Sequence, residues 1–393
     1  MPKGSKAYDI KQYLIAHPEA DYNDVARKFN SSYLYVKKMK SEILKGKLSL
    51  GAGGSPKKEI PSVDQEIVNR RHQEVVKDYQ RRIQELHIRY DELDRKYGEA
   101  LLLKEYTHVE APYITIDPKI KSQAVPIIQY SDWHVEEKIE KVTTNGLNEY
   151  NPDIARKRSE LLVVNTLKLL RKERQDVAIN HLVVCLGGDF INNWLHDHDV
   201  QMNYMTPIEA TVFAKELLKK ALVTLALNAD VKKITVVCIR GNHGRLTKRM
   251  QSSNDYKLNL EAMVYAFLRA ELSDAMFEWY IPESELGYIE VYDKVIRAFH
   301  GHQVSYQGGI GDITIPVNKA IMRWDKTRKA DWNLIHHYHS YWMPTRNTSL
   351  NGSLCGWNSY AASIGAAYEP PTQTFHLLDA KRGFTVRAPI YCE

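Results

Sequence analysis

Five short apolar runs in the C-terminal part of the chain each end in side chains that can bind metal ions. Near-continuous Val/Ile-rich runs of this length indicate buried strands, and the long helical patterns between them predict a layered α/β fold. The runs are Ala124–Tyr130, His181–Leu186, Lys233–Ile239, Lys294–Phe299 and Trp332–Ile335. Long helices are expected at about Asp153–Arg174, Pro207–Leu227 and Leu258–Leu272, and a closing β-hairpin at Thr372–Ile390.

The side chains that follow the five runs are carboxylates, an amide and imidazoles. Because ligands bind beyond the carboxyl ends of strands in open α/β sheets, these five tips are expected to converge. A single His after a strand is more often a structural residue, whereas five such tips in one chain indicate a metal site. The segments are Ser131-Asp132-Trp133-His134, Gly187-Gly188-Asp189, Arg240-Gly241-Asn242-His243-Gly244-Arg245, His300-Gly301-His302 and His336-His337-Tyr338-His339.

The order Asp-x-His, Gly-Asp, Gly-Asn-His, His and His-x-His resembles the calcineurin-like metallophosphoesterase family over residues 120–345, in particular its DNA repair nuclease-like branch. This resemblance implies a two-sheet α/β sandwich with helices on its outer faces and a dinuclear metal site at the strand ends. It also implies seven ligands: Asp132, His134 and His339 for one metal, Asn242, His300 and His337 for the other, and Asp189 for both.

The ligand types predict which metals the site takes. Mixed carboxylate, amide and imidazole ligands suit Mn, Zn or Fe, of which Mn is our expectation, and argue against an all-oxygen Mg or Ca cage. A bridging carboxylate can hold two cations roughly 3.5–4 Å apart, the spacing used for phosphoryl hydrolysis. We take His300 as the ligand after the fourth strand, although a register shift of two residues would exchange it with His302.

The third motif carries the expected proton donor. His243 matches the non-ligand His of the family and is expected to protonate the leaving group or stabilise the transition state. The family usually has an acidic residue after Asn-His, but here Gly244 follows, so His243 lacks that partner unless Asp197 or Asp199 replaces it. Arg245 is expected to bind phosphate instead, through two hydrogen bonds.

Two further departures from the family pattern lie near the other motifs. The usual acidic or His residue shortly after Gly-Asp is replaced by Asn192-Asn193, and we expect Asn193 to contact phosphate. His336 replaces the Gly before the last His-x-His. The polar stretch 194–199 is expected to be a substrate-facing loop, with a third set of metal ligands as the alternative.

The formal net charge of +6 comes entirely from residues 1–60, which hold twelve basic and six acidic side chains. Residues 7–45 are predicted to form three short helices, with Asn30-Ser31-Ser32 as the turn before the third. This unit resembles the helix–turn–helix modules of phage and recombinase-type proteins, which place a helix in the DNA major groove. A helical bundle that merely packs or contacts protein is the alternative. The expected DNA-binding residues on the third helix are Lys37, Lys38, Lys40 and Lys45.

Four segments are predicted along the chain: a helix–turn–helix module at 1–46, a flexible linker at 47–63, a long helix at 64–107 and the phosphoesterase domain at 108–393. The linker is rich in Gly, Ser, Pro and Lys. The apolar residues of the long helix recur at alternating spacings of three and four. This pattern predicts either a coiled coil through which two chains form a homodimer or a spacer helix that packs on the next domain.

Composition excludes other classes of protein. Four scattered Cys residues without a CxxC pair argue against a disulfide framework or a zinc finger. The sequence contains no run of 18 apolar residues, so no membrane span is predicted. The polar N-terminus lacks the apolar segment of a signal peptide. We expect a cytoplasmic protein, with a phage or mobile element as one source.

Three functions fit these motifs. The first is a metal-dependent phosphodiesterase that cuts DNA as an endonuclease or exonuclease, since the basic module would deliver the site to a polyanion. A basic cluster of Arg240, Arg245, Lys248 and Arg249 beside the third motif is expected to bind the backbone. The second is a phosphomonoesterase, a protein or nucleotide phosphatase targeted by the N-terminal module. The third is a non-catalytic DNA-binding regulator, against which the complete ligand set argues.

Overall fold

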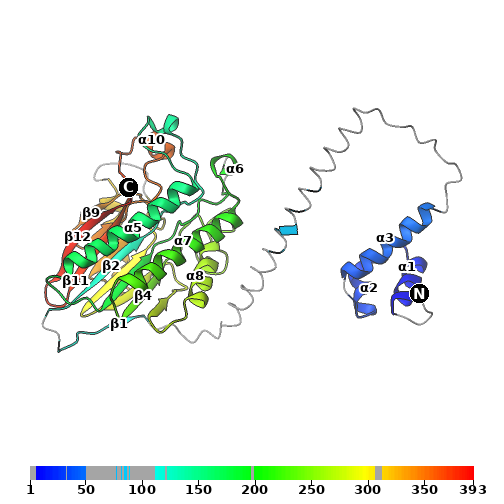
Figure 1. The fold of residues 1–393 in the computed structure, drawn as a ribbon, viewed down its shortest axis with the longest axis horizontal. Coiled ribbons are helices and arrows are strands. Elements are labelled where there is room, and N and C mark those ends of the chain that lie inside the picture. Colours follow the sequence, from blue (N-terminus) through cyan, green and yellow to red (C-terminus); the bar gives the residue numbers. More distant parts are fainter. Residues whose placement is uncertain are drawn as a thin grey trace. The chain divides into compact units, whose positions relative to one another are not determined.

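A computed structural model describes residues 6–31, 33–49, 111–119, 122–195, 199–305 and 312–393, together with single positions between 77 and 88. The chain divides into two compact units, Met1–His87 and Ile88–Glu393 (Figure 1). Most of the predicted long helix at 64–107, its dimer contact and most of the predicted linker at 47–63 lie outside the described residues. In the part of the chain that is described, no helix combines the length and the apolar character that crossing a membrane requires.

The N-terminal unit contains the three expected helices, α1 (Lys6–Ala16), α2 (Tyr22–Lys28) and α3 (Tyr33–Ser49). α2 begins after Asp21, whose carboxylate accepts the backbone N–H groups of Asn23 and Asp24. α3 continues past the boundary predicted at residue 46, because a single Gly costs only about 1 kcal/mol in a helix and does not end it. The side chains that form its core are Ile10, Leu14, Val25, Ala26, Val36 and Met39.

The larger unit consists of two six-stranded sheets. The order of the first sheet is β12 (Gly383–Tyr391), β11 (Thr372–Asp379), β2 (Ala124–Tyr130), β3 (His181–Leu186), β4 (Lys233–Cys238) and β5 (Phe277–Tyr280). The order of the second is β1 (Tyr113–Ile114), β6 (Gly287–Val291), β7 (Lys294–Phe299), β8 (Trp332–Ile335), β10 (Thr348–Leu350) and β9 (Trp342–Thr345).

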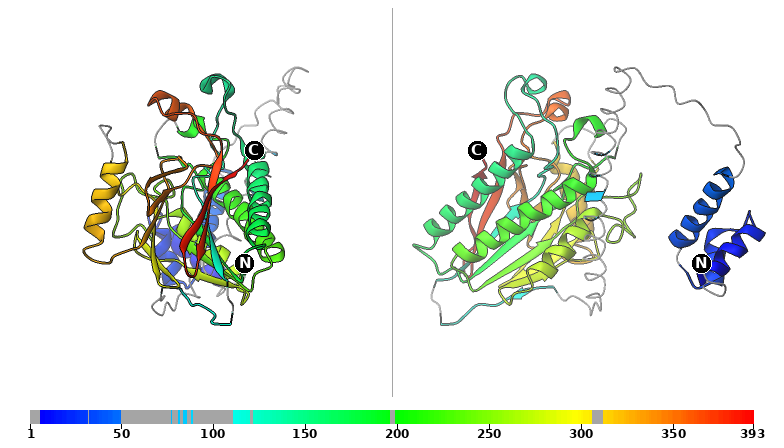
Figure 2. Two further views of the ribbon diagram at one scale, coloured as in Figure 1. Left: turned by 90° about the vertical axis from the view of Figure 1, so that its left-hand side faces the viewer. Right: turned by 45° about the vertical axis from the view of Figure 1, so that its right-hand side comes forward.

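Helices cover the outer faces of the two sheets, which confirms the predicted sandwich (Figures 1 and 2). The first sheet is covered by α5 (Pro152–Glu173), α7 (Pro207–Asn228) and α8 (Leu260–Glu271), whose apolar faces join one core with its strands. The second is covered by α9 (Thr314–Trp324), the helix set apart on the left in the left view of Figure 2. Shorter helices are η1 (Lys141–Thr144), α6 (Asp199–Met202) and α10 (Ser359–Ser363).

A second core lies between the sheets. Alternate residues of β2, β3 and β4 point toward alternate residues of β6, β7 and β8, as the period of two in a strand requires. From the first sheet these side chains are Val125, Ile127, Val183, Cys185, Val237 and Ile239, and from the second they are Ile289, Val291, Ile296, Ala298, Trp332 and Leu334.

The five strands that precede the metal-ligand motifs are divided between the two sheets. β2, β3 and β4 are parallel neighbours in the first sheet, and β7 and β8 are parallel neighbours in the second. Backbone hydrogen bonds join the tips: Asp132 N–H donates to the carbonyl of Gly188, and His336 N–H donates to that of His300. The His300 ring contacts the Gly187 carbonyl across the two sheets. All five tips therefore meet at one edge of the sandwich.

Candidate metal centre

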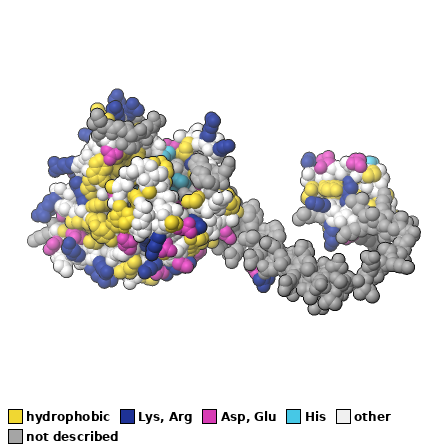
Figure 3. Space-filling model, turned by 90° about the horizontal axis from the view of Figure 1, so that it is seen from above, with side chains coloured by type: hydrophobic (Ala, Val, Ile, Leu, Met, Phe, Trp, Pro, Cys, Tyr) yellow, Lys and Arg dark blue, Asp and Glu magenta, His cyan; other side chains and the backbone are white. Residues whose placement is uncertain are grey.

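Six of the predicted ligands form two groups at this edge. Asp132, His134 and His339 make up the first group, and Asp189, His300 and His337 make up the second. Within each group, one ligand atom from every residue lies within 4.8 Å of the others, the arrangement needed around a cation. Histidine side chains reach the surface of the larger unit on the face seen in Figure 3.

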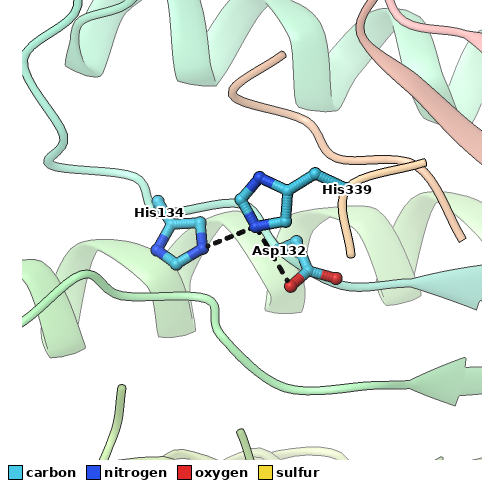
Figure 4. A group of neighbouring side chains, drawn as sticks. All are labelled: Asp132, His134 and His339. Carbon is cyan, nitrogen blue, oxygen red and sulfur yellow. Dashed lines mark hydrogen bonds and ion pairs between the residues drawn. The ribbon is translucent and has the colours of Figure 1, made fainter. Parts of the chain in front are cut away.

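The first group points three ligand atoms at one place (Figure 4). His134 Nε2 lies 3.3 Å from His339 Nε2, which in turn lies 3.4 Å from Asp132 Oδ1. Two facing imidazole nitrogens cannot both present lone pairs to each other favourably, so a cation between them fits this geometry. Asp132 is fully buried, and its Oδ2 accepts the hydroxyl of Ser131 at 2.5 Å. A hydrogen-bonded carboxylate of this kind is oriented before the metal arrives.

The second group is oriented in the same way. His300 Nδ1 lies 2.8 Å from the carbonyl of Gly187, which can only accept, so Nδ1 carries the proton. Nε2 of the same ring faces Asp189 Oδ2 at 2.8 Å. Asn242 Oδ1 is buried without a hydrogen-bond partner among the described residues. An orphaned buried acceptor is costly unless something binds it, and a cation held with Asp189 and His300 would do so.

Backbone conformation marks the same residues. Five of the seven proposed ligands have positive φ: Asp132 at 55°, His134 at 42°, Asp189 at 54°, His337 at 75° and His339 at 53°. Residues other than Gly rarely adopt this region, which costs of order 1–3 kcal/mol each, and such strain is concentrated at functional sites. The positive φ of these residues therefore lowers the stability of the fold while it directs their side chains into the site.

Glycines let the strand tips approach closely enough for the site to form. A Cβ on Gly188 would lie 2.2 Å from the backbone nitrogen of Gly241, and one on Gly241 would lie 2.0 Å from Asp189 Oδ1. A Cβ on Gly187 would lie 2.3 Å from the His336 ring. The absence of a side chain at Gly187 thus leaves room for the buried His336 ring, whose Nε2 lies 3.8 Å from Cys185 Sγ.

We predict that Gly241→Ala weakens Mn binding about 10- to 100-fold, the range for changes that displace a ligand's support. The added Cβ must displace Asp189, because the backbone nitrogen and a carboxylate oxygen of Asp189 both lie within 2.3 Å of the position that the Cβ would occupy. Isothermal titration with Mn measures the loss. Gly146→Ala is the control: a Cβ there meets nothing within 4 Å, so its only cost is the backbone strain of Ala at a φ of 80°. Equal Mn affinity in wild type and Gly241→Ala would contradict the prediction.

The charges of the site favour cations. Burial opposes ionisation of Asp132 and Asp189, but His339 beside the first and His300 beside the second hold the pKa of each well below its usual range. Burial lowers the pKa of His337 to about 3 and also lowers that of His134. Burial opposes protonation of His300 and His339, but Asp189 raises the pKa of His300 to about 9, and Cys355 and Asp132 raise the pKa of His339. A divalent metal binds charged carboxylates and neutral imidazoles, so its binding would release protons from these two rings.

The three residues predicted to be catalytic lie together beside the first group. The His243 ring is 4.9 Å from the His134 ring, and its Nδ1 contacts the carbonyl of Asn192 at 2.8 Å. Among the described residues this carbonyl, and not a carboxylate, is the hydrogen-bond partner of the His243 ring. Asp199 instead accepts the backbone N–H of Leu195, and Asp197 lies outside the described residues.

Asn193, which is predicted to contact phosphate, is hydrogen-bonded to neighbouring loops. Its amide donates to the carbonyls of His243 and Arg245 at 2.8 and 3.0 Å, and its oxygen accepts the N–H of Trp194. Both ends of the Asn193 side chain, the amide nitrogen and the oxygen, are therefore used in bonds to the loops. Arg245 is half-buried, donates to the carbonyl of Asn242, and keeps a buried Nε without a partner among the described residues. It remains our candidate for phosphate binding.

Arg240 is not part of an exposed basic cluster, contrary to prediction. It is buried, pairs with Asp255 at 2.8 Å, and donates to the carbonyls of Pro282 and Glu283. A sequence cannot show that such a side chain turns inward to join three loops. Lys248 and Arg249 are exposed, as expected. His302 lies outside both ligand groups, with its ring 6.4 Å from His337 and both nitrogens buried without partners among the described residues.

Two buried glutamates support the site and were not predicted. Glu261 accepts the N–H groups of Phe190 and Gly241, at 2.7 and 2.6 Å, and so joins the tips of β3 and β4. Glu136 accepts the N–H groups of Asn192 and Asn193. Burial raises the pKa of Glu261 to about 8 and that of Glu136 to about 7, so both carboxylates are costly. No sequence motif marks them, because their partners are backbone groups distant along the chain.

No protein-family model matches the sequence, and no curated protein does either. Among solved structures, the chain is similar to a single mutant of Vps29 from Entamoeba histolytica, at 13% identity and a TM-score of 0.27 over 67% of this chain and 98% of that one. It is similar to a hypothetical protein from Pyrococcus horikoshii OT3, at 14% identity and a TM-score of 0.30 over 68% and 87%. It is also similar to 5'-nucleotidase from Candida albicans SC5314, at 10% identity and a TM-score of 0.29 over 72% and 54%.

All three TM-scores are low, so these likenesses carry no argument about activity. The fold and the two ligand groups together define a two-sheet α/β sandwich with a candidate dinuclear metal centre at its strand ends. What the chain does is therefore inferred from the site itself.

Proposed function

We propose that the larger unit is a dinuclear metallophosphoesterase of the calcineurin-like type and that its substrate is a DNA phosphodiester. The observation that carries this proposal is the pair of three-residue ligand groups at one strand-end edge. We assign Asp189 to both metals, with Mn as the expected ion. When bound, two divalent ions at such a site neutralise phosphate charge and lower the pKa of the attacking water.

His243 has the geometry of a proton donor to the leaving oxygen. The Asn192 carbonyl can only accept, so the 2.8 Å contact keeps a proton on Nδ1. The proton for the leaving oxygen must then come from Nε2 of the doubly protonated ring, which would return to the neutral form with its proton on Nδ1. The ring is half-buried and lies next to the first ligand group, where the phosphate must bind. Proton donation to the leaving group follows from this placement.

The rim beside His243 suits a nucleic acid. Asn193 joins the loop that carries Trp194 to the loop that carries Arg245 and the residues after it. Trp194 is 43% exposed, and Lys248 and Arg249 are exposed on the second loop. An exposed indole can stack on a base while basic side chains contact the backbone, the combination found in proteins that bind single strands. This rim favours a diester substrate over a small monoester.

The N-terminal unit supports the same substrate. Lys37 and Lys38 are exposed on α3, next to the exposed rings of Tyr33 and Tyr35. Lys40 has a different environment, since its Nζ donates to the carbonyl of Pro18 and lies 5.1 Å from the centre of the Tyr22 ring. We therefore assign Lys40 to the fold of the unit. The side chain of Lys45 lies outside the described residues.

Replacing Lys37 and Lys38 together with Glu is expected to weaken DNA binding and to reduce its salt dependence. Each lost phosphate contact lowers the slope of log affinity against log salt by roughly 0.9, so the double variant should lose about 2. Fluorescence anisotropy of a labelled duplex over a range of salt concentrations measures this slope. Lys219→Glu and Lys220→Glu, on α7 of the other unit, form the control pair. An unchanged slope would contradict DNA binding through α3.

The substrate is tested by assaying the full chain with Mn on supercoiled plasmid, linear duplex, single-stranded DNA, bis(p-nitrophenyl) phosphate and p-nitrophenyl phosphate. Cleavage of DNA and of the small diester, both lost in EDTA and restored by Mn, supports the proposal. Hydrolysis of the monoester alone would identify the alternative, a phosphomonoesterase targeted by its N-terminal unit. DNA binding without hydrolysis of any substrate would identify a non-catalytic regulator.

A further inference from the structure

We propose that Glu136 and Asn193 are positioning residues that hold His243 in place, so that a backbone carbonyl serves where a carboxylate partner would otherwise be needed. This inference rests on the proposed phosphoesterase function and concerns the same site. It assigns the two residues a role in protonation of the leaving group, separate from metal binding.

The structure leaves no space for a carboxylate immediately after His243. A Cβ on Gly244 would lie 2.1 Å from Asn259 Oδ1, and the Asn259 amide is fixed by its bonds to the Gly241 carbonyl and to Asp255. The His243 ring is oriented instead by the Asn192 carbonyl, at 2.8 Å from Nδ1. A carbonyl on a loop orients a ring only if the loop itself is held.

Glu136 holds the loop that carries Asn192 and Asn193 through hydrogen bonds to its backbone. Its side chain is fully buried, and a single oxygen, Oε1, accepts the N–H groups of both Asn192 and Asn193 at 2.8 Å. No cation pairs with this carboxylate among the described residues. A buried carboxyl group without a cation is destabilising, and these two hydrogen bonds offset part of the cost. Because Glu136 is two residues from His134, the bonds fix the loop relative to the first ligand group.

Asn193 attaches the same loop to the backbone of His243. Its φ is 63°, and its amide donates to the carbonyls of His243 and Arg245. Asn203 also holds this loop, because its amide donates to the Asn193 carbonyl at 2.8 Å. His243 is thus held twice by one loop, at its ring through Asn192 and at its backbone through Asn193.

This arrangement predicts a loss that depends on the leaving group. If the loop shifts, Nε2 of His243 moves away from the leaving oxygen while both ligand groups stay in place. A leaving alkoxide, as in DNA, needs a proton, whereas p-nitrophenolate leaves without one. A defect in metal binding or in folding would instead lower both activities together.

The test compares wild type, Asn193→Gly and Glu136→Gln on a single-stranded oligodeoxynucleotide and on bis(p-nitrophenyl) phosphate. Glycine tolerates positive φ and removes the amide bonds to the carbonyls of His243 and Arg245. We expect Asn193→Gly to lose about 10- to 100-fold in kcat on the oligonucleotide, as losses of supporting groups do, with an unchanged number of bound Mn ions. On the phenyl diester we expect a change within about threefold.

Two Glu136 variants and one control exchange complete the test. Glu136→Gln keeps an acceptor oxygen and should stay near wild type on both substrates, whereas Glu136→Leu should show the selective loss. Asn145→Gly repeats the exchange at an exposed residue with a φ of 52° and should change neither activity. Equal losses on both substrates, or loss of bound Mn in Asn193→Gly, would overturn the inference. Wild-type protein that cleaves neither substrate would overturn the proposed function and this inference with it.

Discussion

Asp189→Ala is expected to abolish hydrolysis of every phosphoester substrate and to remove bound metal. Asp189 is almost completely buried, with Oδ2 2.8 Å from His300 Nε2 and Oδ1 accepting the N–H of His243 at 2.8 Å. Its loss removes a ligand from the second group and a bond that holds the third motif. Outer-shell changes already cost about 10- to 100-fold in activity, so we expect a larger fall in kcat here. Steady-state kinetics with Mn and elemental analysis of bound metal measure both effects.

The control for this variant is Asp176→Ala, at an exposed position before β3, at the end of that strand away from its metal-ligand motif. It should retain wild-type metal content and activity. Circular dichroism and thermal unfolding show whether Asp189→Ala still folds. An Asp189→Ala protein that is folded and as active as wild type would exclude a metal centre at these strand ends.

His243→Ala is expected to lower kcat on DNA by about 10²- to 10⁴-fold, the usual contribution of a positioned acid or base. The ring is outside both ligand groups, so the amount of bound Mn should not change. Bis(p-nitrophenyl) phosphate should be affected much less, because its leaving group needs no proton. The two substrates, assayed at the same pH and Mn concentration, give this comparison.

The ratio of the two losses distinguishes the roles that His243 can have. A selective loss on DNA identifies proton donation to the leaving oxygen. An equal loss on both substrates would show that His243 stabilises charge on the phosphate and would contradict our assignment. Combining His243→Ala with Asn193→Gly extends the comparison, because a residue that acts only through His243 adds no further loss.

Local patterns in the sequence were enough to predict the strands that carry the ligands. β2, β3, β7 and β8 begin and end where the apolar runs do, and β4 ends one residue earlier than predicted. Each run is buried on both faces, so its apolar character is continuous and easily read. β9 and β10 are short, and β5 and β6 are only partly buried, so these strands gave no comparable signal.

The ligands were predictable because each follows directly from a strand end, whereas their supports depend on tertiary contacts. The residues that bond to Glu136 and Glu261 are up to 71 positions away and bond through their backbone, which has no sequence signature. The same limit explains the wrong prediction that Arg240 is exposed, and it explains why the bonds of Asn193 to neighbouring loops were not predicted. Both are polar residues in or beside the motifs, and both turn inward to satisfy carbonyl groups of neighbouring loops.

Strain and buried charge are concentrated in the same small region. Positive φ at five proposed ligands and two buried carboxylates without cations each reduce stability. A fold retains such features when they fix groups for chemistry, because pre-oriented ligands need no rearrangement when metal and substrate bind. The cost is therefore consistent with a catalytic centre and is hard to explain for a purely structural strand edge.

The most direct test of a dinuclear centre is an anomalous-scattering map from crystals of the full chain grown with Mn. We predict two peaks roughly 3.5–4 Å apart, the spacing of paired-metal phosphoesterase sites. One peak should lie among Asp132, His134 and His339, the other among Asn242, His300 and His337, with Asp189 contacting both. A single peak, no peak, or a pair of peaks that Asp189 does not bridge would contradict the dinuclear centre proposed for this protein.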